Sequence, residues 1–258
     1  MTTTPGAKAG FRQAVGYESI KFRSVRSTIW TMAATAALPV AGAVFVAATG
    51  SLQPDDTVLG GSLTGAVVAQ MLAAVLGALV TTGEYSSGTI RTIRTTLAAN
   101  PRRGIVLAAK AGLVATVLYA TSLLSCTVAY LVGDAMLDDG AYAQGEPLPA
   151  LFGIAGSFAA AGVLGLAVGT LVRHSAGAVT TVIGVLLLPS LFGPVFGAAQ
   201  RWIAGVSPTA ALEKLMQTSD ASAEAVGSLG AWPSLWLVVA YTTAVPAAAA
   251  AVLRTRDA

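Results

Sequence analysis

The stretch from Ala150 to Val172, ALFGIAGSFAAAGVLGLAVGTLV, contains no charged residue and decides the fold class of this chain. A helix rises about 1.5 Å per residue, so about 20 apolar residues cross a hydrocarbon layer roughly 30 Å thick. Backbone groups in lipid must be hydrogen-bonded within the segment or by closure of a barrel. The stretch does not alternate apolar with polar residues, so we expect a transmembrane helix.

Five further stretches are apolar and at least as long as a span requires, and only Lys110, near one end of the third expected span, carries a charge. The six expected spans are Thr28–Thr49, Gly60–Thr82, Ile105–Gly133, Ala150–Val172, Ala176–Ala199 and Trp232–Leu253. Of the 258 residues, 55% are hydrophobic and 10% charged, whereas soluble domains have about 25% charged residues. This composition excludes an ordinary cytosolic enzyme and a disordered protein, and the single cysteine, Cys126, excludes a disulfide scaffold. We expect an all-α, polytopic membrane protein with one domain over residues 1–258.

The distribution of charged residues predicts the orientation of the expected spans in the membrane. With a cytoplasmic N-terminus, all of the 15 Lys and Arg residues except Arg201 and Lys214 fall inside or at the inner ends of spans. Basic loop residues stay on the cytoplasmic side of a membrane. Among the 12 acids, only Glu18, Glu84 and Asp257 fall inside. We therefore expect a plasma-membrane protein with both termini cytoplasmic, and the net charge of +3 reflects this topology rather than nucleic-acid binding.

Residues 11–27 have an apolar stripe at helical spacing, with arginines on another face. The stripe contains Phe11, Val15 and Phe22, and the basic positions include Arg23 and Arg26. This pattern favours an amphipathic helix in the inner membrane interface. The alternative is a positively charged flank that only orients the first span.

The outer half of the chain contains a second set of candidate residues. Pro189, Gly193 and Pro194 interrupt the fifth expected span, so its outer part should bend or break and face protein or a water-filled path. Gln70 is one of several polar residues within spans and is a candidate for the same pathway. The outer loop 200–231 should contain a short helix after Pro208 that rests on or dips into the interface.

Two stripes of small residues predict close helix packing. One contains Gly65, Ala69, Ala73 and Gly77, and the other Gly162, Gly165 and Gly169. Small residues at this spacing let helices approach closely in lipid. Either stripe is a candidate for the subunit interface, although an alanine-rich chain also produces such stripes by chance.

Catalytic and metal-binding chemistry is not expected in this chain. It has no phosphate-binding G-x-x-x-x-G-K-[ST] loop. His174 and Cys126 are the only residues of their types and predict neither a metal site nor a nucleophile pair. No Asp or Glu lies within an expected span, whereas ion-coupled transporters need such groups. Uphill transport by this chain would therefore need energy from a separate partner.

The cytoplasmic segment 84–104 has the most distinctive pattern. Glu84 leads a short helical stretch that Pro101 should end. Ile90, Ile93 and Leu97 share one side of that helix, and Arg91 and Arg94 lie on another. The pattern favours a lever that docks on a cytoplasmic partner, and the alternative is a solvated basic turn.

The order of motifs in this segment resembles the permease subunits of type-2 ABC exporters, especially the half-size actinobacterial group. The matching residues are Glu84, Gly88-Thr89, Pro101-Arg102-Arg103 and Lys110. The resemblance extends over the amphipathic first helix, the six spans and the long final outer loop. One departure is the repeat of Thr89-Ile90-Arg91 as Thr92-Ile93-Arg94, which lengthens or rotates the expected helix.

The resemblance implies that the loop after the second span is a coupling helix that docks on a nucleotide-binding ATPase. It further implies two separately encoded ATPase subunits and a second permease subunit, in a homodimer or heterodimer, with ATP and Mg²⁺ bound only by the ATPases. The implied cargo is a hydrophobic or amphipathic drug, natural product or lipid. Two alternatives remain open, namely a stand-alone channel or secondary transporter and a non-transporting membrane scaffold or immunity protein.

Overall fold

The computed structural model describes residues 7–52, 55–84, 103–137, 142–192, 195, 199–218, 221, 222 and 226–256. Within these residues the regular structure is helical, apart from an isolated parallel bridge between Thr57 and Ala143. The expected all-α class is therefore confirmed.

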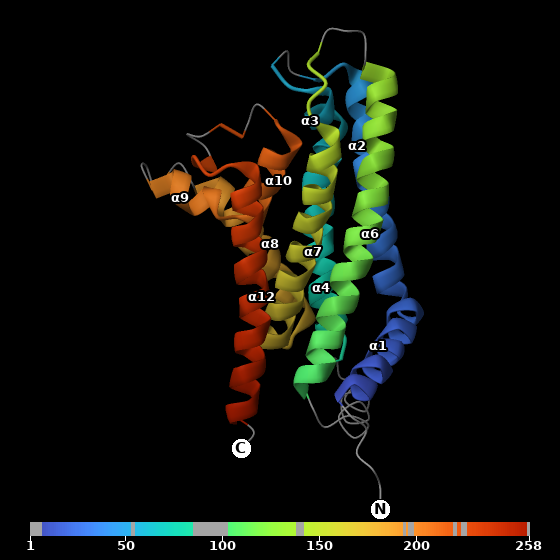
Figure 1. The fold of residues 1–258 in the computed structure, drawn as a ribbon, viewed down its shortest axis with the longest axis vertical. Coiled ribbons are helices and arrows are strands. Elements are labelled where there is room, and N and C mark those ends of the chain that lie inside the picture. The colour runs from blue at the N-terminus through green and yellow to red at the C-terminus, as the bar shows by residue number, and fades with distance from the viewer. Residues whose placement is uncertain are drawn as a thin grey trace, which may run out of the picture.

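Ten helices are described, and those along the long axis of the molecule form a bundle (Figure 1). Four of them are long and apolar enough to cross a membrane: α2 (Arg26–Thr49), α4 (Thr64–Thr82), α6 (Arg103–Leu137) and α7 (Pro147–Val172). Two further helices, α8 (Ser175–Phe192) and α12 (Ala231–Arg256), have shorter apolar stretches. The remaining helices are α1 (Ala7–Ser24), α3 (Val58–Ser62), α9 (Gln200–Gly205) and α10 (Pro208–Met216).

The helix boundaries differ from the expected ones by a few residues at several places, and two differences bear on the fold. The amphipathic helix ends at Ser24 rather than 27, because Val25 is extended (φ −89°, ψ 116°). The second expected span is divided at Leu63 into α3 and α4, and the Thr57 side chain caps α3 by accepting a hydrogen bond from Gly60 N–H at 3.0 Å. The helix with Pro189 is described over Ser175–Phe192, and residues 193 and 194 lie outside the described residues.

Both stripes of small residues pack inside the chain, mostly where α4 meets α7, whereas Gly65 packs against Leu38 of α2. A Cβ on Gly77 would lie 1.9 Å from the carbonyl oxygen of Gly162, and one on Gly165 would lie 1.8 Å from that of Ala74. Since no side chain fits at these distances, the two backbones touch directly. The stripes are thus explained by packing within one subunit and need no subunit interface.

The outer loop also contributes to the bundle. The helix expected after Pro208 is present as α10, and the side chains of Leu212, Leu215 and Met216 are fully buried. Gln70, in the middle of α4, donates a hydrogen bond from Nε2 to the carbonyl oxygen of Pro208 at 3.1 Å. This helix therefore packs into the bundle rather than resting on its surface.

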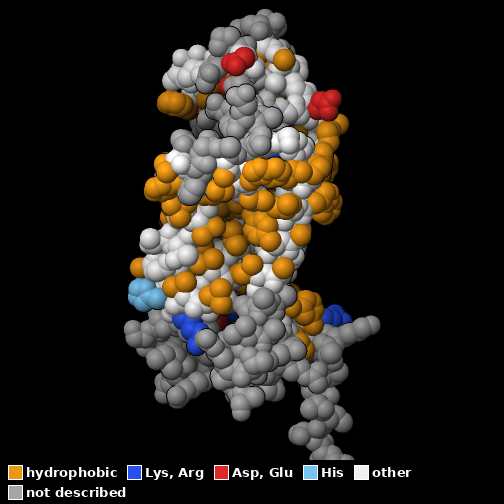
Figure 2. All heavy atoms as spheres, turned by 90° about the vertical axis from the view of Figure 1, so that its left-hand side faces the viewer, with side chains coloured by type: hydrophobic (Ala, Val, Ile, Leu, Met, Phe, Trp, Pro, Cys, Tyr) orange, Lys and Arg blue, Asp and Glu red, His pale blue; other side chains and the backbone are white. Residues whose placement is uncertain are grey.

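Opposite charges gather at opposite ends of the molecule, with hydrophobic side chains between them (Figure 2). The basic end, where α1 and the last turn of α12 lie, includes Arg12, Lys21, Arg23 and Arg26 (Figure 1). The acidic end includes Asp55, Asp56, Asp134 and Glu146. Such a band of exposed apolar side chains between two polar ends is typical of a membrane protein.

Candidate functional site

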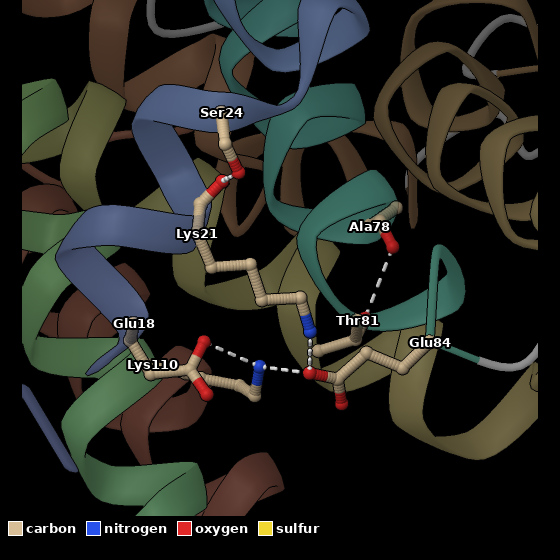
Figure 3. Close-up of polar contacts among 7 residues, drawn as sticks. All are labelled: Glu18, Lys21, Ser24, Ala78, Thr81, Glu84 and Lys110. Atoms are coloured by element: carbon tan, nitrogen blue, oxygen red, sulfur yellow. Dashed lines mark hydrogen bonds and ion pairs between the residues drawn. The ribbon is translucent and has the colours of Figure 1, made fainter. Parts of the chain in front are cut away.

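Four charged side chains form a cluster at the basic end. Lys110 Nζ donates hydrogen bonds to Glu18 Oε2 and to Glu84 Oε1, both at 2.6 Å. Lys21 Nζ also donates to Glu84 Oε1 (Figure 3). We call these four residues, Glu18, Lys21, Glu84 and Lys110, the ion cluster.

Local helix geometry brings the four residues together. Glu18 and Lys21 are three residues apart on α1, so they share one face of that helix. Glu84 directly follows Gly83, the C-terminal cap of α4. Lys110 lies about two turns into α6, which begins at Arg103. The ion cluster thus joins three helices that are far apart in sequence.

Because the ion cluster is largely buried, the pairing of its charges is important for stability. The side chains of Lys110 and Glu18 are only 4% and 3% exposed, and that of Glu84 is 12% exposed. Removing a charged group from water costs several kcal/mol, and only close pairing offsets this cost. The ion cluster contains two carboxylates and two ammonium groups, so α1, α4 and α6 must stay together to keep each charge paired.

A cavity of about 420 Å³ lies beside the ion cluster. Glu18, Lys21 and Lys110 line it together with Phe22 of α1 and the backbone region of Gly83. Within the described part of the chain, Glu18 Oε1 is buried and has no hydrogen-bond partner. The ion cluster therefore contains an unsatisfied carboxylate oxygen that the protein encloses.

Most of the expected coupling residues lie outside the described residues. This holds for Gly88, Thr89, Ile90, Arg91, Ile93, Arg94, Leu97, Pro101 and Arg102. Arg103 is the first residue of α6, and its side chain is likewise outside the description. Glu84, the described residue just before this segment, forms ion pairs with Lys110 and Lys21.

The residues of the expected interfacial helix lie on or beside α1. Phe22 is half-buried and packs against the main hydrophobic core, and Val15 is half-buried as well. Phe11, Arg23 and Arg26 are exposed. An exposed apolar side chain next to exposed arginines fits a helix at a membrane surface.

Of the expected pathway residues, the structure describes Gln70 and Pro189. Gln70 is fully buried and tethers α10. Pro189 is half-buried inside α8, and Gly193 and Pro194 lie outside the described residues. His174 is exposed between α7 and α8 and accepts a hydrogen bond at Nδ1 from Gly177 N–H at 3.3 Å.

Sequence reasoning missed Glu18 and Lys21 as site residues. The one available signal was Glu18 itself, an acid in an otherwise basic amphipathic helix. No group of three or more His, Cys, Asp or Glu side chains placed to hold a metal ion occurs in the described residues. The candidate site can therefore pair charges and receive a ligand in its cavity, and its described residues supply no metal centre.

Comparisons with known proteins do not extend this description. No protein-family model matches the chain, and no curated protein matches it.

Proposed function

We propose that this chain is the transmembrane subunit of an ATP-driven ABC exporter in the plasma membrane. It has six spans with both termini cytoplasmic, pairs with a second permease subunit, and is powered by separate nucleotide-binding subunits that bind ATP and Mg²⁺. Its cargo is a hydrophobic or amphipathic small molecule. The proposal rests on the motif order around residues 84–110 and on the ion cluster.

The ion cluster is the observation that carries the proposal. Glu84 lies just before the segment 85–102, and Lys110 lies shortly after it, so the ion pair between them ties the two flanking helices together. Glu18 and Lys21 connect both flanks to α1. A force applied to the segment 85–102 by a partner would therefore reach α1, α4 and α6 at once.

The location of the ion cluster favours a permease driven by a partner ATPase over an ion-coupled transporter. Lys110 lies near the start of α6, and both acids lie on α1 or after the end of α4. Proton- or sodium-coupled transport needs ionisable groups along the path through the membrane. The sequence has no Asp or Glu in the expected spans, so an external ATPase is the better source of energy.

The separation of charge supports the proposed orientation. The basic end carries α1 and the last turn of α12, and it also carries the ion cluster (Figures 1 and 3). Basic residues concentrate on the cytoplasmic side of membrane proteins. This orientation directs the segment 85–102 toward ATP and toward a cytoplasmic ATPase.

The middle of α4 and the outer part of α8 contribute to the pathway in this proposal. Gln70, Pro189, Gly193 and Pro194 are its expected residues, because a proline interrupts the backbone hydrogen bonds of a helix. The buried helix α10 adjoins Gln70 and would cover the pathway from outside.

Purification of the tagged chain from its native membranes in a mild detergent tests the function. We expect an ATPase with a phosphate-binding loop to copurify, and we expect the reconstituted complex to export an amphipathic dye only with ATP. A chain that moves solute through vesicles without an ATPase is instead a channel or secondary transporter. A chain that neither holds an ATPase nor moves solute would support the scaffold or immunity role.

A further inference from the structure

The cavity beside the ion cluster has apolar walls and an exposed rim. Its volume of about 420 Å³ lies within the range of small-molecule pockets, about 300–1,000 Å³. Its walls include apolar side chains of three helices, namely Phe22 of α1, Leu79 and Val80 of α4, and Leu113 of α6. Its rim includes the exposed residues Val25, Ser27 and Ser175. A ligand that fits this cavity therefore has an apolar part and enters from the surface of the molecule.

The charge that the cavity presents to a ligand is positive. Its charged lining residues are Glu18, Lys21 and Lys110. Glu18 and Lys110 are almost fully buried and paired with each other, and Glu18 Oε1 is enclosed by the protein. The side chain of Lys21 is 21% exposed, and one of its three ammonium protons is donated to Glu84. Lys21 is therefore the charged group that a ligand can reach, and it favours an anion.

The first turn of α2 adds hydrogen-bond donors to the same cavity. Its cap residue, Val25, makes no side-chain hydrogen bond to the start of the helix, and its first turn has no acidic residue. The first backbone hydrogen bond runs from Ile29 N–H to the carbonyl oxygen of Val25. The N–H groups of Arg26, Ser27 and Thr28 therefore have no partner within the helix. Since Ser27 and Thr28 line the cavity, an anion there would meet the positive end of the helix dipole.

The Thr28 side chain is an independent indication of a ligand. Thr28 lines the cavity and is 4% exposed, and its hydroxyl group has no hydrogen-bond partner among the described residues. Other threonine hydroxyl groups, such as those of Thr35 and Thr82, donate to a carbonyl oxygen four residues earlier in the same helix. A buried hydroxyl group without a partner is costly. An anion in the cavity would accept a hydrogen bond from Thr28 and remove this cost.

We propose that this cavity binds an anionic phospholipid of the cytoplasmic leaflet. The phosphate accepts hydrogen bonds from Lys21, from Thr28 and from the first N–H groups of α2, and one acyl chain lies against Leu79 and Leu113. Basic pockets between transmembrane helices at the cytoplasmic side are suited to anionic head groups. The inference rests on the membrane placement and orientation given under the proposed function, and it is independent of any ATPase.

Photolabelling of the purified full chain in phosphatidylcholine bilayers tests the proposal. The probe is phosphatidylglycerol with a diazirine in one acyl chain, and the matched probe is phosphatidylcholine with the same chain. Both have a phosphate, but only the first has a net negative charge. One cationic side chain near a membrane favours an anionic lipid about fivefold, so we expect at least that preference in the labelling of Leu79, Val80 and Leu113. Equal labelling by the two probes would overturn the proposal.

A lysine variant and an arginine variant connect the preference to this cavity. Lys21→Met removes the accessible charge, while Glu84 keeps its ion pair with Lys110. It should lower the labelling by phosphatidylglycerol to that by phosphatidylcholine. Arg12→Met removes the same charge at an exposed position of α1 outside the cavity lining and should leave the preference intact. Equal losses in both variants would show only a general attraction of the basic end for anionic lipid and would contradict the site.

The hydroxyl group of Thr28 is tested by Thr28→Val, which keeps the shape of the side chain. Labelling of the cavity by both lipids should fall about tenfold, because both have a phosphate and a hydrogen bond to a charged group contributes at least that factor. Thr35→Val is the control, since the Thr35 hydroxyl donates to the carbonyl oxygen of Thr31 in the same helix. Labelling that is unchanged in Thr28→Val would contradict the proposed position of the phosphate.

Two valine variants on α4 locate the acyl chain without changing a charge. Val80→Phe fills part of the cavity and should abolish the preferential labelling of Leu79 and Leu113 by phosphatidylglycerol. Val68→Phe, on the exposed face of the same helix, should leave it intact. Preferential labelling that persists in a folded Val80→Phe protein would place the lipid elsewhere and overturn the proposal.

Inorganic phosphate has the same anionic chemistry without an acyl chain, and competition distinguishes the two sources. We expect millimolar inorganic phosphate to leave the labelling as it is in chloride of equal ionic strength. Displacement of the lipid probe by inorganic phosphate would identify a free phosphate as the occupant and contradict the lipid assignment. Since no ATPase is present in any of these measurements, their outcome is separate from that of the proposed transport function.

Discussion

Lys110 Nζ lies 2.6 Å from Glu18 Oε2, although 92 residues separate the two in sequence. This contact fixes the amphipathic helix α1 against α6. Glu84, which follows the end of α4, pairs with the same Lys110 ammonium group. The three helices therefore meet beside Glu84 and the start of α6, which flank the segment 85–102 in sequence, and that junction is the basis of the proposed mechanism.

Substitution Lys110→Met should strongly destabilise the protein. Methionine keeps most of the apolar stem but removes the ammonium group, which leaves the carboxylates of Glu18 and Glu84 near each other without their shared cation. Removing one partner of a buried ion pair costs about 3–5 kcal/mol. Thermal or denaturant unfolding in detergent measures the change.

Lys214→Met is the matched control for Lys110→Met. Lys214 is partly buried and donates one hydrogen bond to Ser234 Oγ at 3.0 Å, so its loss should cost about 1 kcal/mol. Equal destabilisation by the two substitutions would show that the ion cluster adds nothing beyond an ordinary hydrogen bond.

Gly77→Ala should disrupt the packing of α4 against α7. The new Cβ would lie 1.9 Å from the carbonyl oxygen of Gly162, so the helices must separate, at a cost of about 1–3 kcal/mol or more. Gly112→Ala on α6 is the control, because no atom lies within 4 Å of its added Cβ. That control should be neutral or slightly stabilising, since alanine favours helices over glycine. Unfolding midpoints that drop equally in both variants would refute the close contact.

Gln70→Leu should loosen α10. The substitution removes the hydrogen bond to the carbonyl oxygen of Pro208, which contributes about 0.5–1.5 kcal/mol. We expect faster hydrogen–deuterium exchange in the backbone amides of Pro208–Met216. Gln13→Leu, on the exposed face of α1, makes the same chemical change and should leave that exchange unaltered. Unchanged exchange in Gln70→Leu would mean that the tether does not hold α10.

Single cysteines at exposed positions test the orientation. In a Cys126→Ser background, Glu146→Cys at the acidic end should react with a membrane-impermeant thiol reagent on intact cells. His174→Cys, exposed at the turn between α7 and α8, should react only after the cells are opened. The reverse pattern would mean that the chain has the opposite orientation in the membrane, with the segment 85–102 on the side away from any cytoplasmic ATPase.

The long helices α2, α4, α6 and α7 were predictable because each contains a long apolar stretch with few charged residues. The fourth expected span, Ala150–Val172, lies within α7, which is Pro147–Val172, and the prediction omitted only the first residues of that helix. The divided second span was not foreseen, because the break at Leu63 has no proline in the sequence to signal it. It depends on the Thr57 cap of α3 and on packing by the rest of the fold.

The candidate site was predictable only in part. Glu84 and Lys110 belong to a local motif and could be found from their spacing along the chain. Glu18 and Lys21 could not, because their pairing depends on how α1 folds back against α4 and α6 rather than on any local pattern. The small-residue stripes predicted a close contact, but only the three-dimensional structure shows that α4 and α7 make it with each other.

The docking of the segment 85–102 on an ATPase is tested most directly by copurification of the ATPase with the double variant Ile93→Asp, Leu97→Asp. Burial of an apolar side chain of this size contributes about 1.5–3 kcal/mol, and two buried carboxylates would oppose docking further. The control, Leu148→Asp with Leu229→Asp, adds the same charges at exposed positions outside the segment. The account predicts that the first variant inserts normally but loses the ATPase and ATP-dependent export, while the control retains both. A first variant that inserts, holds the ATPase and exports as the wild type does would contradict it.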